Sequence, residues 1–324
     1  MSGPAPLPHA STPEAWDALL DDDEALRGGV LTIARRHRLV PRDDGPVRYD
    51  SGSLPVYALG DDAVLKLYPP AEGEHAAVEA RVLAFVDARL PVATPRVLAT
   101  GTQDGWHYLL MSRLPGRRLV EVWPELDLGD RTRIAEQTGA AIAALHGLDA
   151  SPLGTLEPAW DAFAVRQRRT ATERQRARGL APHWLDLVDE FLDAWMPPAP
   201  GRRALLHTEV MREHLLVAPS PAGGGFALSG LIDFEPAMLG DPDYEFASVG
   251  LFVTCGDGLL LRRLLLASVR PAAELDGQDL ACRLMAHALL HRYSNLRWYL
   301  ERLPVPGATT LEDLARAWWG TPAR

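Results

Sequence analysis

Apolar and polar positions alternate in short runs between residues 52 and 115, a pattern typical of β-strands with one buried face. The alternation predicts four strands, at Pro55–Leu59, Ala63–Tyr68, Arg96–Thr100 and Trp106–Met111. A tight turn at residues 60–62 joins the first two. Between the second and third, Glu74–Leu90 has apolar residues at helical spacing and stops before Pro91. This stretch therefore predicts a small sheet that carries one helix.

After Pro115 and Gly116 the apolar residues follow the i, i+3, i+4 spacing of amphipathic helices. Six helices are predicted, at Arg131–Leu148, Trp160–Arg178, Trp184–Trp195, Gly258–Val269, Asp276–Leu303 and Thr310–Trp319. Short strands are predicted among them, at Leu205–His207, His214–Ala218 and Phe226–Phe234, the last two joined by the turn-rich segment Pro219–Gly225. Residues 1–45 predict a further helix, Pro13–Arg27. The expected fold class is α+β, with a small β-rich lobe and a larger helical lobe.

Composition narrows the class of protein. The chain has 324 residues, 47% of them hydrophobic and 23% charged, as in an ordinary globular protein. Its net charge of −10 opposes binding to nucleic acid or to an anionic membrane and favours a cationic substrate. Two cysteines cannot form a disulfide framework, and neither a signal peptide nor a membrane-spanning stretch is recognisable. We therefore expect a cytoplasmic protein without nucleic-acid or membrane partners.

Lys66 is the only lysine in the chain; the other 32 basic residues are arginine. It lies on the second predicted strand, and Glu79 follows on the same face of the next helix as Val82, Leu83 and Val86. A lysine on a sheet paired to a helical glutamate is the arrangement that kinase-type sites use to hold the α- and β-phosphates of ATP. Two plainer explanations stay open: a chance survivor of the arginine bias, or a surface salt bridge worth under about 1 kcal/mol.

The hairpin region supplies a second set of polar residues. Glu209 is followed five residues later by His214, and Asp233 comes after the next strand. Phosphoryl transfer needs a carboxylate to position the attacking hydroxyl, and further ligands for metal ions that bridge the phosphates. Taken alone, these residues could equally be a solvated glutamate, a hairpin histidine and a turn aspartate.

Several motifs in order give the chain a resemblance to a known family. They are Val64–Tyr68, Glu79–Arg81, Tyr108–Gly116, Leu145–His146, the loop at His207, Ile232–Phe234 and Gly240–Pro242. In this order they resemble the aminoglycoside phosphotransferase family, which has a bilobal protein-kinase-like fold. Within it, Met111–Arg113, Arg166–Arg178 and Leu311–Pro322 are most similar to the hygromycin-B 7″-O-kinase branch. The resemblance implies an N-terminal helical extension at 1–45, a nucleotide-binding N-lobe at 46–114, and a helical C-lobe with the catalytic hairpin and acceptor site at 115–324.

The resemblance also implies an activity and a role for each residue. The activity is transfer of phosphate from ATP, or GTP, with Mg²⁺ or Mn²⁺, to a hydroxyl of a small molecule such as an antibiotic or metabolite. Lys66 would hold the phosphates and Glu79 would orient it, while the backbone of Ser112, Arg113 and Leu114 would contact the adenine. Asp233 and His214 would ligate the metal, and Glu209 would be the catalytic carboxylate.

The catalytic loop departs from the family pattern, which is His-Gly-Asp with an asparagine five residues after the aspartate. Here the sequence is His207-Thr208-Glu209, with His214 in the asparagine position. Glutamate is one methylene longer, and displacing a reacting group by about 1 Å can cost on the order of a hundredfold in rate. Imidazole suits Mn²⁺ or Zn²⁺ better than Mg²⁺.

These departures motivate an alternative function. The chain could be a pseudokinase, or a peptide-directed Ser/Thr kinase component of a biosynthetic or regulatory complex, with a peptide or protein partner. The run Arg166–Arg178 holds six arginines opposed by Glu173 alone, so it predicts either a solvated helix face or a docking surface for an acidic peptide or a phosphate. His287 and His291, four residues apart, fit a packed helix better than a zinc site. Trp298, Tyr299, Trp318 and Trp319 are more typical of packing than of a substrate platform.

Overall fold

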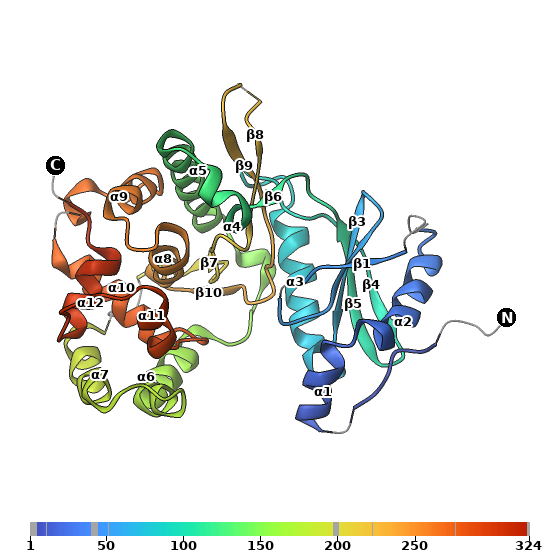
Figure 1. The fold of residues 1–324 in the computed structure, drawn as a ribbon, viewed down its shortest axis with the longest axis horizontal. Helices are drawn as coiled ribbons and strands as arrows, with labels where there is room; N and C mark the ends of the chain where they lie inside the picture. The colour runs from blue at the N-terminus through green and yellow to red at the C-terminus, as the bar shows by residue number, and fades with distance from the viewer. Residues whose placement is uncertain are drawn as a thin grey trace. The chain divides into compact units, whose positions relative to one another are not determined.

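A computed structural model describes residues 5–10, 12–39, 45–50, 52–196, 201–221, 223–275 and 277–322. The chain forms two compact units (Figure 1). Unit 1 consists of residues 1–88, 93–115 and 233–235, and unit 2 consists of residues 89–92, 116–232 and 236–324. Helices and strands occur together, which confirms the predicted α+β class. Among the described residues, no helix combines the length and the apolar character needed to cross a membrane.

Unit 1 is built on a five-stranded antiparallel sheet. Its strands are β1 (Val47–Arg48), β2 (Val56–Leu59), β3 (Ala63–Tyr68), β4 (Val97–Gln103) and β5 (Trp106–Ser112), in the order β1-β2-β3-β5-β4. The β2–β3 hairpin turns at Gly60, whose φ of 70° suits glycine. Val56 pairs with Lys66 across this hairpin, and Lys66 pairs with Leu109 on the other side. Lys66 thus lies on a strand with paired neighbours on both sides.

Helices cover the two faces of this sheet. On one face, α1 (Pro13–Leu20) and α2 (Asp23–Arg36) contribute to a core with Leu65, Leu67 and Trp106 (Figure 1). On the other, α3 (Gly73–Val86), after the short helix η1 (Pro70–Glu72), packs on β4 and β5. Because side chains alternate along a strand, Lys66 points to the face opposite Leu65 and Leu67, toward α3.

The N-terminal helical region extends further along the chain than the sequence pattern predicts, and it consists of two helices instead of one. The predicted single helix Pro13–Arg27 is wrong, because Asp22 interrupts it: its side chain accepts the Ala25 N–H and caps a second helix. Helix α3 ends at Val86 rather than Leu90, just before Ala88, whose φ is +57°. Of the predicted extension 1–45, residues 1–4, 11 and 40–44 lie outside the described residues.

Unit 2 is mostly helical. Its α-helices are α4 (Leu119–Val122), α5 (Leu128–Gly147), α6 (Trp160–Ala177), α7 (Pro182–Trp195), α8 (Pro242–Val249), α9 (Gly258–Ala267), α10 (Gln278–Leu290), α11 (Leu296–Arg302) and α12 (Leu311–Trp319). Shorter helical turns are η2 (Trp123–Glu125), η3 (Ser151–Leu153), η4 (Gly250–Thr254) and η5 (Ala272–Leu275). Helix α5 packs against α9, and α10 packs against α8 and α12. These contacts enclose the core of the unit.

Two small sheets lie among these helices. The strands are β6 (Arg117–Arg118), β7 (Ala204–Leu206), β8 (Leu215–Pro219), β9 (Phe226–Leu231) and β10 (Met238–Gly240), paired as β6-β8-β9 and β10-β7. The sequence pattern missed β1, β6 and β10, which have only two or three residues each, and α8, although Asp241 and Pro242 form an ordinary helix start. Residue 222 of the predicted hairpin connection lies outside the described residues.

The predicted helix Asp276–Leu303 is also wrong. It is two helices, α10 and α11, separated at residues 291–295, and Asp276 lies outside the described residues. Asn295 caps α11 by accepting the Trp298 N–H, and the Ser294 hydroxyl accepts a bond from the Gln175 amide. Periodicity alone cannot reveal a break that distant side chains stabilise.

Candidate functional site

Lys66 lies at the centre of a buried ion cluster in unit 1. The lysine is 6% exposed, and its Nζ lies 2.9 Å from Glu79 Oε2 and 2.6 Å from Asp233 Oδ1. Burial opposes its charge, but Asp233 and Glu79 outweigh that cost and hold the pKa of Lys66 well above its usual range. The predicted Lys66–Glu79 pair is therefore present, and it is buried rather than a surface salt bridge.

Glu79 uses both carboxylate oxygens. Oε1 accepts the backbone N–H of Phe234 at 3.1 Å, and the Tyr68 hydroxyl donates to Oε2. The Tyr68 ring also lies 5.4 Å from Lys66 Nζ. Burial, followed by the Glu79 charge, raises the pKa of Tyr68, so this hydroxyl stays a donor. Tyr68 was not predicted as a site residue, although it lies two residues after Lys66 on the same face of β3.

Asp233 reaches the cluster by an unusual backbone conformation. Its φ is +73°, in the left-handed region that aspartate tolerates better than most residues. This turn ends the predicted strand Phe226–Phe234 at Leu231. The Asp233 side chain is 30% exposed, and its Oδ1 contacts Lys66 Nζ.

Glu235 is a third acid near this cluster, in addition to Glu79 and Asp233, and was not predicted from the sequence. Burial raises the pKa of its carboxyl, and the charges of Lys66 and His75 partly oppose this. His75 Nδ1 lies 3.1 Å from Glu235 Oε1. The sequence signal was the run Ile232–Glu235, in which two acids flank a buried aromatic residue.

Of the three residues predicted to contact adenine, Ser112 is the last residue of β5, and Arg113 and Leu114 follow it. The Ser112 N–H donates to Arg96 O and the Arg113 N–H donates to Asp62 O, both at 2.8 Å. These two donors are therefore engaged within unit 1. The Leu114 N–H is the donor of the three that a nucleobase could use without displacing one of these bonds.

Unit 2 holds the loop 207–214, anchored by His207. Its backbone N–H donates to Glu245 Oε2 at 2.7 Å, and the Glu245 side chain is fully buried. The ring Nε2–H donates to Ile232 O at 2.9 Å, while Nδ1 accepts the Glu209 N–H at 3.3 Å. One neutral tautomer satisfies both ring contacts, so His207 fixes the backbone on which Glu209 stands.

Thr208 has a φ of +72°, which is strained for a β-branched residue. Its carbonyl accepts a bond from His291 Nε2 at 3.2 Å, and its hydroxyl donates to Pro236 O at 3.3 Å. Burial lowers the pKa of His291 to about 4, so the ring is neutral when it donates. A family glycine at this position suits the same backbone without strain.

Glu209 and His214 lie within the same loop, and both are partly buried. The His214 Nδ1–H donates to Glu209 O at 2.9 Å, and His214 O accepts the Ile232 N–H at 3.0 Å. In the neutral ring this bond leaves the lone pair on Nε2, the nitrogen suited to ligate a metal. Unit 2 therefore brings the two substituted residues of the loop together through the backbone.

The described residues contain no cluster of three His, Cys, Asp or Glu side chains able to hold a metal ion by themselves. His287 and His291 are buried among aromatic side chains, as expected of packing residues. The His287 ring is buried 6.3 Å from that of Trp160 and 5.9 Å from that of Tyr244, while His291 stacks on Tyr244. Tyr299, Trp318 and Trp319 are likewise buried, whereas Trp298 is 40% exposed.

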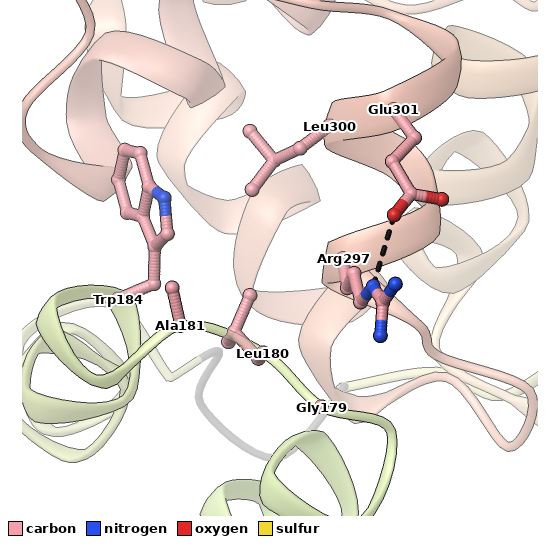
Figure 2. Close-up of a pocket in the computed structure, with 7 residues that line it drawn as sticks. All are labelled: Gly179, Leu180, Ala181, Trp184, Arg297, Leu300 and Glu301. Carbon is pink, nitrogen blue, oxygen red and sulfur yellow. Dashed lines mark hydrogen bonds and ion pairs between the residues drawn. The ribbon is translucent and has the colours of Figure 1, made fainter.

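A surface pocket of about 290 Å³ lies elsewhere in unit 2 (Figure 2). Its lining residues are Gly179, Leu180, Ala181, Trp184, Arg297, Leu300 and Glu301. Arg297 and Glu301 form an ion pair of 2.9 Å at one side, and Trp184 and Leu300 line the other (Figure 2). No residue of the 207–214 loop lines this pocket, so it is not the centre of the candidate site.

Comparison with solved structures shows the same fold in several phosphotransferases. The GDP complex of wild-type aminoglycoside 2'-phosphotransferase-IIIa has a TM-score of 0.68 at 17% identity, over 89% of this chain and 97% of that one. Macrolide 2'-phosphotransferase MphH from Brachybacterium faecium has a TM-score of 0.59 at 23% identity, over 91% and 99%. The streptomycin–ATP–APH(2")-IIa ternary complex has a TM-score of 0.58 at 16% identity, over 85% and 94%.

Sequence comparison agrees with the fold. No curated protein matches the chain. The model of the phosphotransferase enzyme family matches residues 47–280, which include all the candidate site residues of both units. Since this match spans well over half of its length, the chain belongs to the phosphotransferase enzyme family.

Proposed function

We propose that the protein transfers the γ-phosphoryl group of ATP or GTP to a hydroxyl of a small molecule in the cytoplasm. The observation that carries this proposal is the buried cluster of Lys66, Glu79 and Asp233 in unit 1. A buried cation held by two carboxylates is costly to maintain for stability alone. In a phosphotransferase a lysine in such a cluster neutralises the charge of the bound phosphates, which would account for the cluster here.

The residues of unit 1 would bind the nucleotide. Lys66 would contact the α- and β-phosphates, exchanging part of its pairing with Asp233 for phosphate oxygens. Glu79 would keep the ammonium in place, since Tyr68 and the Phe234 N–H fix its own orientation. Leu114 N–H would donate to the nucleobase. Two of the solved relatives were observed with a nucleotide bound, one with GDP and one with ATP, which supports use of either nucleotide here.

Asp233 and His214 would hold a divalent cation together with the phosphates. The residues fit such an ion: Asp233 offers a partly exposed carboxylate and His214 an imidazole nitrogen, and a nucleotide-bound metal needs few protein ligands. The bound ion would neutralise charge on the phosphates. An imidazole ligand favours Mn²⁺ over Mg²⁺.

Glu209 would act on the acceptor. The acceptor oxygen attacks the γ-phosphorus, the bond from that phosphorus to the bridging oxygen breaks, and the hydroxyl proton passes to the Glu209 carboxylate. His207 and Thr208 would set the position of Glu209 through the backbone contacts of the loop. The resemblance to the hygromycin-B branch makes an aminoglycoside one candidate acceptor.

One feature favours a second function. The loop combines a strained Thr208 with Glu209 and His214 in place of the family residues, as expected of a pseudokinase or a peptide-directed kinase with altered turnover. Such a protein would bind nucleotide and a peptide or protein partner, and a pseudokinase would not phosphorylate a small molecule. Turnover with small hydroxyl compounds therefore separates the two functions.

Calorimetry with non-hydrolysable ATP and GTP analogues, in Mg²⁺ and in Mn²⁺, tests the proposal. We expect binding that is tighter with Mn²⁺, a preference that His214→Asn shifts toward Mg²⁺. Arg176→Gln, which removes a surface arginine paired with Glu173, is the matched control and should change nothing. Absence of binding at millimolar nucleotide by the folded protein would overturn the proposal.

A further inference from the structure

Helix α6 carries most of the basic run Arg166–Arg178, and its arginines differ in their contacts. Arg168 pairs with Asp189 and Asp193, and Arg176 pairs with Glu173. Arg174 donates to the carbonyls of Leu289 and His291 at 3.1 and 3.0 Å. These three arginines are engaged within unit 2. Arg166, like Arg169 and Arg178, forms no ion pair with any acid in the part of the chain that the structure describes.

Arg166 and a second arginine, Arg292, share one aromatic ring. Each guanidinium carbon lies 5.9 Å from the centroid of Phe163, a side chain that is 1% exposed. Arg292 likewise has no acidic partner within the described ranges; its Nη2 contacts only the sulfur of Met238, and its buried Nε has no hydrogen-bond partner there. Neither guanidinium group has an acidic partner among the described residues, so an anion that reaches both would relieve the repulsion between them.

Arg292 is linked to the 207–214 loop through short contacts of its own backbone and of its neighbour His291. Arg292 follows His291, whose ring donates to the carbonyl of Thr208 at 3.2 Å. The Arg292 N–H donates to the Tyr244 hydroxyl at 3.1 Å, and Tyr244 stacks on His291 with ring centroids 4.9 Å apart. Glu209 is the next residue after Thr208, so Arg292 is connected through His291 to the backbone beside the proposed catalytic carboxylate.

The electrostatics of nearby tyrosines agree with this placement. Burial raises the pKa of Tyr244, and the Arg292 charge opposes that rise while the Glu209 charge adds to it. Burial raises the pKa of Tyr299 to about 12, and there Arg178 and Glu209 act in opposite directions. Arg292 and Glu209 thus both act on Tyr244, whose hydroxyl also accepts the Arg292 N–H.

We propose that the acceptor is a small molecule that carries an anionic group, a phosphate or a carboxylate, bound by Arg166 and Arg292 while its hydroxyl faces Glu209. This inference rests on the proposed phosphotransferase function. Guanidinium groups bind phosphate and carboxylate through paired, charge-assisted hydrogen bonds. The same positive charge would repel a polycationic aminoglycoside, so the local charge outweighs the acidic net charge of the chain in selecting the acceptor.

Binding of inorganic phosphate, measured by calorimetry at constant ionic strength without nucleotide, tests the anion site directly. We expect Arg166→Gln and Arg292→Gln to weaken phosphate binding at least about tenfold, since each removes a charge-assisted contact. Arg176→Gln, on the same helix and with the same change of charge, should bind phosphate like the wild type. No binding by the wild type, or equal binding by all variants, would overturn the inference. Arg166 is exposed, so its variant should fold even if Arg292→Gln does not.

Turnover of Mn²⁺–ATP with matched acceptors tests the anion site and the proposed phosphotransferase function separately. The acceptors are glucose, glucose 6-phosphate, gluconate, kanamycin and an acidic serine peptide. We expect glucose 6-phosphate or gluconate to be used at least tenfold more efficiently than glucose, the two anions distinguishing a phosphate from a carboxylate site. Faster turnover of kanamycin or of the peptide than of the two anionic acceptors overturns the inference, while the proposed phosphotransferase function stands. If phosphate binding depends on the two arginines but none of the acceptors is phosphorylated, the anion site is supported and the proposed phosphotransferase function is overturned.

Discussion

The Lys66 cluster of unit 1 and the 207–214 loop of unit 2 hold their polar groups by different means. In the cluster, charged side chains neutralise one another: one ammonium between two carboxylates. In the loop, hydrogen bonds between the Glu209 backbone and the imidazole rings of His207 and His214 fix the backbone that carries the Glu209 side chain. The cluster should therefore respond to a loss of charge with a loss of stability, whereas the loop should respond through activity.

The largest effect is expected from Lys66→Met. Removing the ammonium leaves the Glu79 and Asp233 carboxylates together in a buried site, which costs about 3–5 kcal/mol of unfolding free energy. Urea denaturation measures this loss, and calorimetry should show that nucleotide binding is lost as well. Arg36→Met, at an exposed cation of the same unit, is the control and should cost less than about 1 kcal/mol. A loss for Lys66→Met as small as the control would mean that the cluster is not an ion cluster in solution.

Much of this cluster follows from sequence patterns, and the rest lies beyond their reach. Strand alternation and helical spacing are local patterns, so they suffice to place Lys66 and Glu79 on facing surfaces. Asp233 lies 167 residues from Lys66, and only the ordered motifs of the family connect the two. The contribution of Tyr68 depends on a side-chain direction that strand alternation allows but does not single out.

Glu209→Gln should affect the chemistry and leave the fold intact. General-base assistance is typically worth ~10²–10⁴, so the phosphotransfer rate should fall by at least about a hundredfold while nucleotide affinity stays within a few-fold. Single-turnover kinetics measure the first and calorimetry the second. Glu209→Asp restores the family residue as a companion variant. An unchanged rate for Glu209→Gln would remove Glu209 from the catalytic role.

Unit 2 shows where sequence patterns fail. The sequence pattern predicts a continuous helix through residues 291–295. The helix is broken there because Ser294 and His291 form hydrogen bonds with groups on other elements. The basic run on α6 looks like one surface in the sequence, but Arg174 satisfies carbonyl groups at the end of α10 and Arg168 bridges to α7. Such partners are distant in sequence, so periodicity and composition carry no trace of them.

His291 gives this loop an acid sensitivity. Its pKa is lowered to about 4 in the folded protein by burial, whereas an unfolded histidine titrates near about 6.5. Between these values the unfolded state binds the proton and the folded state does not, so stability is complete above about pH 6.5 and falls toward pH 4. The loss is roughly 3 kcal/mol. His291→Gln should remove this part of the pH dependence in urea titrations, while His183→Gln, at an exposed histidine, should not. Equal pH slopes for the two variants would contradict the assignment.

The smallest effect, and the sharpest in sign, concerns Thr208. In most positions alanine is more stable than glycine, because glycine loses more backbone entropy on folding. At Thr208 the φ of +72° reverses the order, since a Cβ in the left-handed region costs about 1–2 kcal/mol. Thr208→Ala and Thr208→Gly both remove the hydroxyl bond to Pro236 O, so the difference between them isolates the strain. Thr208→Gly should be more stable than Thr208→Ala by about 1 kcal/mol in urea denaturation. If alanine is the more stable of the two, Thr208 does not hold the left-handed conformation that sets the backbone before Glu209.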